Sequence, residues 1–266
     1  MKDLVVTAIQ SNLVWENPEA NRLHFDQHLA SIQSETDVVV LPEMFTTGFS
    51  MSPKTIAEKM DLENMATLNW MRAWAKKLNA VITGSVSVEE NKKYFNRLLW
   101  VRPDGTFSTY DKRHTFTFAG EDKHYHSGNE LLVEEWRGWK ICPLICYDLR
   151  FPAWSRNKLT DGKPLYDMLI YVANWPSVRI EVWKKLLFAR AIENQCYLLG
   201  VNRIGDDPNG NKYVGDSAFI NPRGEYLYQF NKWIEEVATQ SLSWDELEDF
   251  RAKFPVLSDA DNFSMR

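Results

Sequence analysis

Pro143-Leu144-Ile145-Cys146-Tyr147-Asp148-Leu149-Arg150-Phe151-Pro152 carries an apolar, strand-like segment directly into a charged turn. A junction of this kind displays the last side chain of the strand, so Cys146 is predicted to lie at a sheet edge and not in the core. A thiol in such a position can act as a nucleophile when a base and a cation lie nearby. The rest of the chain must then supply the groups that activate Cys146.

Strand-like and helical segments alternate on both sides of this junction. Strands are predicted at residues 4–9, 38–41, 81–88, 94–101, 106–110, 139–145, 167–173, 196–201, 218–221, 225–230 and 235–242, and helices at 18–32, 62–78 and 177–195. Such alternation predicts an α/β fold in which layers of helix cover sheet. Because no linker, repeat or low-complexity segment interrupts it, residues 1–266 are expected to form one domain with a short tail from about residue 243.

The composition narrows the class of protein. The chain has 266 residues, of which 44% are hydrophobic and 25% charged, as in an ordinary globular protein. A net charge of −5 with no basic block argues against nucleic acid as a partner, and no apolar run is long enough for a membrane-spanning helix. Three cysteines and an N-terminus too short in apolar residues for a signal peptide indicate free thiols and a cytoplasmic location.

Two other predicted strand ends carry groups that could activate a thiol. Glu43 follows the 38–41 strand among apolar neighbours, which desolvate a carboxylate as a catalytic base requires. Lys112 follows the second strand of a predicted hairpin, where a cation could stabilise an oxyanion. On spacing alone, a helix cap or loop residue is the simpler interpretation of Glu43, and a solvated charge patch is the simpler interpretation of Lys112.

Five segments, in this order, resemble the nitrilase (carbon-nitrogen hydrolase) superfamily, and its omega-amidase-like branch most closely. They are residues 41–45, 111–114, 146–152, 189–197 and 221–225. The resemblance implies a four-layer αββα sandwich, a catalytic triad of Glu43, Lys112 and Cys146, and a homodimer. It also implies an amidohydrolase that cleaves a small dicarboxylate monoamide, such as 2-oxoglutaramate or 2-oxosuccinamate, to carboxylate and ammonia. A cysteine thioester would form on the way, and neither metal nor cofactor would be needed.

Two further groups are expected to support the oxyanion. Glu121 resembles the further glutamate of the family, whose role would be to hold Lys112 or the leaving amine in place. The backbone N–H of Tyr147 directly follows the nucleophile at the turn, so it is predicted to be a second oxyanion donor. Both predictions require the strand ends to meet at one edge of the fold.

Substrate-binding residues are predicted from their positions near the triad. Arg150 could pair with a substrate carboxylate, or it could hold Asp148 or the loop of Glu43, and both interpretations stay open. Trp175 follows the 167–173 strand at an equivalent position, and Phe118 lies near the second junction. The two aromatic residues are expected to wall a narrow pocket.

Several alternatives remain at this level. His114, beside Lys112, allows a Cys–His hydrolase, whereas His124 and His126 are spaced poorly for a zinc site. The triad would also serve a nitrilase, a small aliphatic amidase or a carbamoylase, and a catalytically idle binding module is the alternative outside the enzymes. The sequence does not decide whether residues 46–59 close as a lid.

Overall fold

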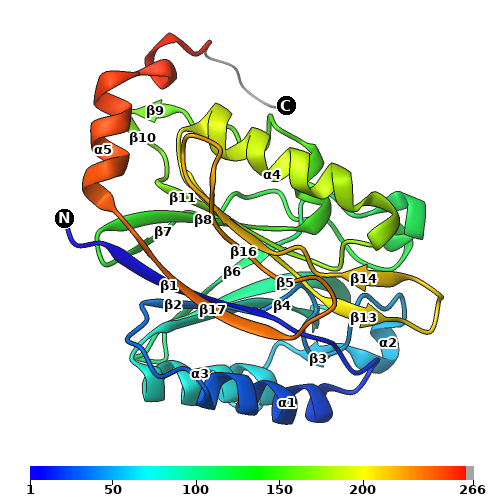
Figure 1. Cartoon of the computed structure of the whole chain (residues 1–266). Coiled ribbons are helices and arrows are strands. Elements are labelled where there is room, and N and C mark those ends of the chain that lie inside the picture. Colours follow the sequence, from blue (N-terminus) through cyan, green and yellow to red (C-terminus); the bar gives the residue numbers. More distant parts are fainter. Residues whose placement is uncertain (262–266) are drawn as a thin grey trace.

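Two β-sheets pack face to face between two layers of helices in the computed structural model, which describes residues 1–261 (Figure 1). Helices α1 (Pro18–Ala30) and α3 (Ala66–Leu78) cover the outer face of the first sheet. Helix α4 (Ile180–Asn194) covers the outer face of the second. The predicted four-layer αββα sandwich is confirmed by this arrangement.

The first sheet combines parallel and antiparallel pairs. In spatial order it contains β17 (Glu236–Leu242), β1 (Leu4–Gln10), β2 (Val38–Val40), β4 (Val81–Glu90), β5 (Lys93–Val101) and β6 (Phe107–Asp111), and β3 (Glu58–Lys59) pairs with β4 outside this order. Strands β1, β2 and β4 run parallel. Because β5 is antiparallel to both β4 and β6, strand β6 ends at the same edge as β2.

The second sheet has a parallel centre. In spatial order it contains β16 (Tyr226–Gln229), β15 (Ala218–Ile220), β12 (Tyr197–Asn202), β11 (Met168–Ala173), β8 (Trp139–Ile145) and β7 (Glu134–Trp136). Strands β8, β11 and β12 are parallel, so their carboxyl ends lie side by side. Two small ribbons, β9 (Leu159–Thr160) with β10 (Lys163–Pro164) and β13 (Ile204–Asp206) with β14 (Lys212–Val214), stand outside the sheets.

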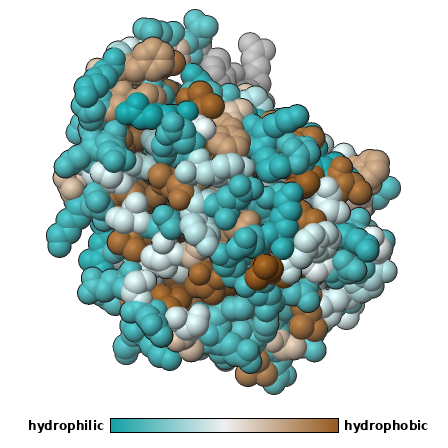
Figure 2. All heavy atoms as spheres, viewed as in Figure 1, coloured by the Kyte–Doolittle hydropathy of each residue, from teal (hydrophilic) through white to brown (hydrophobic). Residues whose placement is uncertain are grey.

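Shorter helices lie in the connections and after the last strand. They are α2 (Pro53–Ile56), η1 (Thr117–Ala119), η2 (Glu121–Lys123), η3 (Cys146–Arg150), η4 (Ser177–Arg179), α5 (Trp244–Lys253) and η5 (Val256–Asp259). No helix within residues 1–261 is both long and apolar enough to cross a lipid bilayer. On the face seen in Figure 2, hydrophobic residues lie in scattered patches between hydrophilic ones.

Strand β2 is apolar throughout because both of its faces are buried. Its side chains alternate between two buried faces, as the two-residue repeat of a strand requires. Val38 and Val40 lie in the core between the two sheets, whereas Val39 packs in the core beneath α1 and α3. The strand is therefore covered on both faces, and its end places Glu43 inside the protein.

Helix α4 lies close to the second sheet because strand β12 carries a glycine. A Cβ atom built on Gly200 would lie only 2.7 Å from Leu187 Cδ1 and 2.8 Å from Trp183 Cζ2. Both side chains belong to α4 and are buried. Any larger residue at position 200 would push the helix away from the sheet.

Several element boundaries differ from the sequence prediction, and two of the differences have a clear local cause. Helix α3 begins at Ala66 and not at residue 62, because residues 61–64 form a turn held by the Asp61 carboxylate. Strand β4 extends to Glu90, and the hairpin turn is only Asn91-Lys92, both with positive φ (52° and 62°). Two consecutive positive φ angles match the right-handed twist of the flanking strands.

The C-terminal segment packs against the second sheet. The Ser243 side chain accepts a hydrogen bond from the Glu246 backbone N–H at 3.3 Å, which caps α5. Leu247 joins the core, and Arg251 Nη1 lies 2.7 Å from Asp167 Oδ1 in a buried ion pair. Residues 262–266 of the predicted tail lie outside the described residues.

Replacing Arg251 by alanine should destabilise the protein, because the Asp167 carboxylate would stay buried without its cation. The expected loss is about 3 kcal/mol of unfolding free energy. Denaturant titration followed by circular dichroism measures it. As a matched control, Lys253→Ala removes the exposed pair with Asp249 on the same helix and should cost less than ~0.5 kcal/mol. Equal losses in the two variants would show that the buried pair does not attach α5.

Candidate active site

Lys112 lies at the centre of a buried charge cluster. Its side chain is only 1% exposed, and its Nζ donates to Glu43 Oε1 at 2.9 Å and to Glu121 Oε2 at 2.9 Å. Burial alone would lower the pKa of Lys112, but Glu121 and Glu43 outweigh it and raise that pKa above its ordinary value. Lys112 therefore stays a cation at neutral pH, although it has left water.

Glu43 is fixed by donors from both sheets. Asn96 Nδ2, from β5, donates to Glu43 Oε1 at 2.9 Å. The backbone N–H of Asn174, just after β11, donates to Glu43 Oε2 at 2.7 Å, and Asn174 Nδ2 donates to the Glu43 carbonyl oxygen at 2.6 Å. These bonds tie the end of β2 to the end of β11, so one carboxylate joins the two halves of the sandwich.

Glu121 completes the cluster from a short loop. Besides Lys112, it accepts hydrogen bonds from the Phe116 backbone N–H at 2.5 Å and from Asn96 Nδ2 at 3.3 Å. Burial raises the pKa of Glu121, Lys112 opposes this, and the negative charge of Glu43 adds to it, so that the pKa is raised overall. The predicted contact between Glu121 and Lys112 is present.

Cys146 begins the turn η3 at the end of β8 and has a positive φ of 44°. A non-glycine residue rarely adopts this conformation, and such strain is common where a functional side chain is presented. Burial raises the pKa of the Cys146 thiol well above its usual range; Glu43 adds to the rise, and Lys112 opposes it. A raised pKa favours the thiol over the thiolate, so a neighbouring base would help the sulfur to react.

Asp148 holds the turn that presents Cys146. Its Oδ2 accepts from Tyr110 Oη at 2.8 Å and from the Ile145 backbone N–H at 3.1 Å. Its Oδ1 accepts from the His114 backbone N–H at 2.9 Å and lies 2.8 Å from His114 Nδ1. The carboxylate thus connects β6 and the following loop to η3.

His114 is not placed as a base for Cys146. Its ring stacks on Phe151 at 3.8 Å between centroids, with 7° between the ring planes, and its Nδ1 faces Asp148. The ring is also absent from the lining of the cavity that contains Cys146. This geometry favours Glu43 over the Cys–His alternative.

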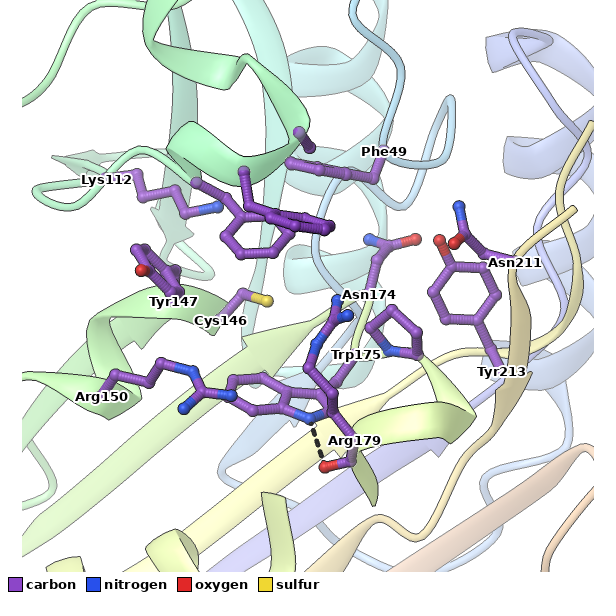
Figure 3. A pocket seen from close by; sticks show the side chains of 14 residues that line it. Phe49, Lys112, Cys146, Tyr147, Arg150, Asn174, Trp175, Arg179, Asn211 and Tyr213 are labelled. Carbon is purple, nitrogen blue, oxygen red and sulfur yellow. Dashed lines mark hydrogen bonds between the residues drawn. The ribbon is translucent and has the colours of Figure 1, made fainter. Parts of the chain in front are cut away.

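Cys146 opens into a cavity of about 150 Å³. In Figure 3, Lys112 and two arginines, Arg150 and Arg179, lie on opposite sides of Cys146. The lining residues come from both sheets and from the loops after them. They are Phe49, Lys112, Phe116, Phe118, Ala119, Cys146, Tyr147, Arg150, Asn174, Trp175, Pro176, Arg179, Asn211 and Tyr213.

Arg150 and Arg179 share one feature that matters for ligand binding. Within residues 1–261, neither guanidinium forms an ion pair with a carboxylate. Arg150 lies over the Trp175 ring at 5.1 Å, and Arg179 lies over the Phe116 ring at 5.3 Å. Asp148 is satisfied by other donors, so Arg150 does not hold it in place.

Trp175 and Phe118, the two aromatic residues predicted to wall the pocket, differ in burial. Trp175 is 3% exposed, and its Nε1 donates to the Arg179 carbonyl oxygen at 2.9 Å (Figure 3). Phe118 is 85% exposed and lies at the rim of the cavity, not in a buried wall.

Tyr147 lines the cavity, and its backbone N–H belongs to the first turn of η3, where N–H groups lack intrahelical partners.

Sequence reasoning missed several lining residues. The predicted helix over residues 177–195 includes Arg179, whereas this residue belongs to the separate turn η4 that precedes α4. Tyr213 lies in β14 and Asn211 in the turn before it, where apolar and polar residues do not alternate strongly. Phe49, from the segment considered as a lid, lies with its ring 5.0 Å from Lys112 Nζ.

Comparison with known proteins assigns the chain to a family. Residues 5–252 match the carbon-nitrogen hydrolase family model. The chain belongs to the carbon-nitrogen hydrolase family. The predicted nitrilase-superfamily membership and hydrolase class are therefore confirmed.

Three relatives of this carbon-nitrogen hydrolase are informative. The chain is 48% identical to the omega-amidase YafV of Escherichia coli strain K12 over 265 residues, covering 100% of both proteins. It is 31% identical to the 2-oxoglutaramate amidase of Bacillus subtilis strain 168, over 96% of each. The crystal structure of XC1258 from Xanthomonas campestris, a CN-hydrolase superfamily protein with an arsenic adduct in its active site, has a TM-score of 0.97, with 42% identity and complete coverage of both chains.

Substitutions at Glu43 and His114 should separate the two candidate bases. Glu43→Gln keeps the side-chain shape but removes the proton acceptor, so turnover should fall by roughly 10²- to 10⁴-fold. His114→Asn removes one hydrogen bond to Asp148 and should lower turnover by less than about tenfold. Steady-state ammonia release measures both variants. The opposite order of effects would favour the Cys–His alternative.

Proposed function

We propose that this carbon-nitrogen hydrolase is an omega-amidase, which hydrolyses the terminal amide of a small dicarboxylate monoamide such as 2-oxoglutaramate or 2-oxosuccinamate. The observation that carries the proposal is the pair Arg150 and Arg179 beside a cysteine that faces Glu43 and Lys112. In the part of the chain that the structure describes, these two guanidinium groups have no carboxylate partner. A substrate carboxylate would neutralise the arginines, since guanidinium groups bind carboxylates through paired hydrogen bonds. Relatives named omega-amidase and 2-oxoglutaramate amidase support the same substrate class.

The size of the cavity also supports a small substrate. Its volume of about 150 Å³ is below the roughly 300–1,000 Å³ usual for pockets that bind drug-sized ligands. Lys112 and Cys146 lie toward one side and the arginines toward the other (Figure 3). A short molecule with an amide at one end and a carboxylate at the other would fit both sides at once.

In the first half of the proposed reaction, Glu43 accepts the Cys146 proton while the sulfur attacks the amide carbonyl carbon. The carbonyl oxygen becomes an oxyanion, stabilised by Lys112 and by the Tyr147 backbone N–H. Glu43, now a neutral acid, returns the proton to the amide nitrogen, the carbon–nitrogen bond breaks, and ammonia leaves. An acyl thioester remains on Cys146.

In the second half, Glu43 again acts as the base. It removes a proton from water, whose oxygen attacks the thioester carbonyl at the same oxyanion position. Collapse of this intermediate breaks the carbon–sulfur bond, releases the dicarboxylic acid and returns the proton to sulfur. Glu121 supports both halves by holding the Lys112 ammonium group against the oxyanion.

Asn174 supplies a further substrate contact in this proposal. The residue is 4% exposed, and its Oδ1 has no hydrogen-bond partner within residues 1–261. A buried acceptor without a donor is costly, whereas the N–H groups of a substrate amide would satisfy it. This contact would orient the amide plane for attack by Cys146. The Trp175 ring, in turn, packs against the Arg150 guanidinium.

The same proposal extends to the whole protein. We propose that residues 1–266 act as a single hydrolase domain with a tail from about residue 243, that it works in the cytoplasm, and that it forms a homodimer. Val182 and Ile192 on α4 and Phe254 after α5 are exposed apolar side chains. A second subunit that packs against α4 would bury such surface, which supports the proposed homodimer.

Ammonia release from a panel of amides tests the substrate class. The panel contains 2-oxoglutaramate, 2-oxosuccinamate, glutamine, asparagine, propionamide, an N-carbamoyl amino acid and a nitrile. The two 2-oxo monoamides should give the highest kcat/KM, and Cys146→Ala serves as the blank. Activity confined to nitriles or N-carbamoyl compounds would refute the omega-amidase proposal.

Substitution of either arginine should affect only substrates that carry a carboxylate. Arg150→Met and Arg179→Met should each lower kcat/KM for 2-oxoglutaramate by about 10- to 150-fold, because a hydrogen bond to a charged group contributes about 1.5–3 kcal/mol. The low activity with propionamide should change little. Arg137→Met, a half-exposed arginine outside the cavity, is the matched control. Equal losses with both substrates would assign the arginines a structural role instead.

A further inference from the structure

A second cluster of reactive side chains lies outside the catalytic cavity. His24 and His28 are one turn apart on α1, and Glu235 directly precedes β17. Their ligand atoms all lie within 4.8 Å of one another, and no other group of three such side chains this close is found in the part of the chain described, residues 1–261. None of the three lines the cavity that contains Cys146.

The distances match the coordination shell of a tetrahedral metal. His24 Nε2 lies 3.3 Å from His28 Nε2 and 2.8 Å from Glu235 Oε1, and His28 Nε2 lies 3.8 Å from Glu235 Oε2. These separations lie on either side of the roughly 3.3 Å between donor atoms around Zn²⁺ at bond lengths of about 2.0–2.1 Å, with Glu235 turning Oε1 toward His24 and Oε2 toward His28. Small side-chain rotations would therefore be enough to place all three atoms at bonding distance from one ion.

Hydrogen bonds within the cluster compete for too few protons. His24 Nε2 faces both Glu235 Oε1 and His28 Nε2, but a neutral imidazole carries at most one proton at this nitrogen. One of these close contacts therefore lacks a proton in the neutral state. A cation at the centre would interact favourably with both ring nitrogens and the carboxylate at once.

Neighbouring groups hold the carboxylate in place. The Asn12 backbone N–H donates to Glu235 Oε1 at 2.9 Å, and Ser11 Oγ lies 3.1 Å from both Glu235 Oε1 and His28 Nε2. Residues 11 and 12 directly follow β1. Outer contacts of this kind orient metal ligands and strengthen binding.

We propose that His24, His28 and Glu235 bind one borderline divalent cation of the Zn²⁺ type. Two imidazoles and a carboxylate suit Zn²⁺, and a water molecule would complete four ligands. The ion would connect α1 to the start of β17, a strand at the edge of the first sheet whose partner in that sheet is β1. Its role is to stabilise this edge, so the site is independent of the proposed amidase reaction.

Isothermal titration of untagged, chelator-treated protein with ZnCl₂ tests the proposal. Cys146→Ala is the background, because a free active-site thiol also binds zinc. One ion should bind per chain, and melting temperature should rise by about 5 °C or more at a free metal concentration near 100 times Kd. His24→Gln and His28→Gln should each weaken binding by about 100-fold or more.

The matched control changes histidines that lie elsewhere. A His124→Gln, His126→Gln double variant should keep the full affinity, the single stoichiometry and the melting shift. With Cys146 present, His24→Gln should release ammonia at the rate of the chelator-treated parent, which shows that the variant is folded. Equal zinc affinity in the parent and in both single histidine variants, or no binding in the parent, would overturn the proposal.

Discussion

One constraint organises the molecule: Lys112 is buried between Glu43 and Glu121, where an unpaired ammonium group would cost several kcal/mol. With two carboxylates and one cation, the cluster would carry a net negative charge. Donors from Asn96, Asn174 and Phe116 compensate part of that charge. Burial, together with the negative charge of Glu43, raises the pKa of Glu121. These donors come from both sheets and one loop, so the cluster is complete only when the whole sandwich has formed.

The same charge balance shapes the chemistry proposed for the cysteine. Burial and the negative charge of Glu43 raise the pKa of the Cys146 thiol, and Lys112 opposes them. A nucleophile of this kind depends on a base placed beside it, unlike a thiolate stabilised at rest by a cation. Farther out, Arg150 and Arg179 line the cavity as cations. In the proposed reaction they would bind the substrate carboxylate at a distance from the bond that is cleaved.

The strand pattern predicted an α/β fold and placed Glu43, Lys112 and Cys146 each after an apolar strand. The four layers and the meeting of the three side chains were implied by the resemblance to the nitrilase superfamily and not by spacing. The sequence did not predict Arg179, since a turn of 3-10 helix directly before α4 has the same local pattern as the helix itself. The partners of Asp148 and the unsatisfied Oδ1 of Asn174 depend on contacts between distant segments. Glu235 lies more than 200 residues from His24 and His28, so their meeting follows from the pairing of β1 with β17 and not from spacing.

The proposed thioester on Cys146 is the central claim, and mass spectrometry of enzyme quenched with acid during turnover of 2-oxoglutaramate tests it most directly. The predicted result is a peptide containing Cys146 that is heavier by the acyl group of the substrate after loss of ammonia. The adduct should disappear on treatment with hydroxylamine, which cleaves thioesters. Sustained turnover with Cys146 unmodified in the quenched enzyme, or an acyl group on another residue, would contradict the mechanism.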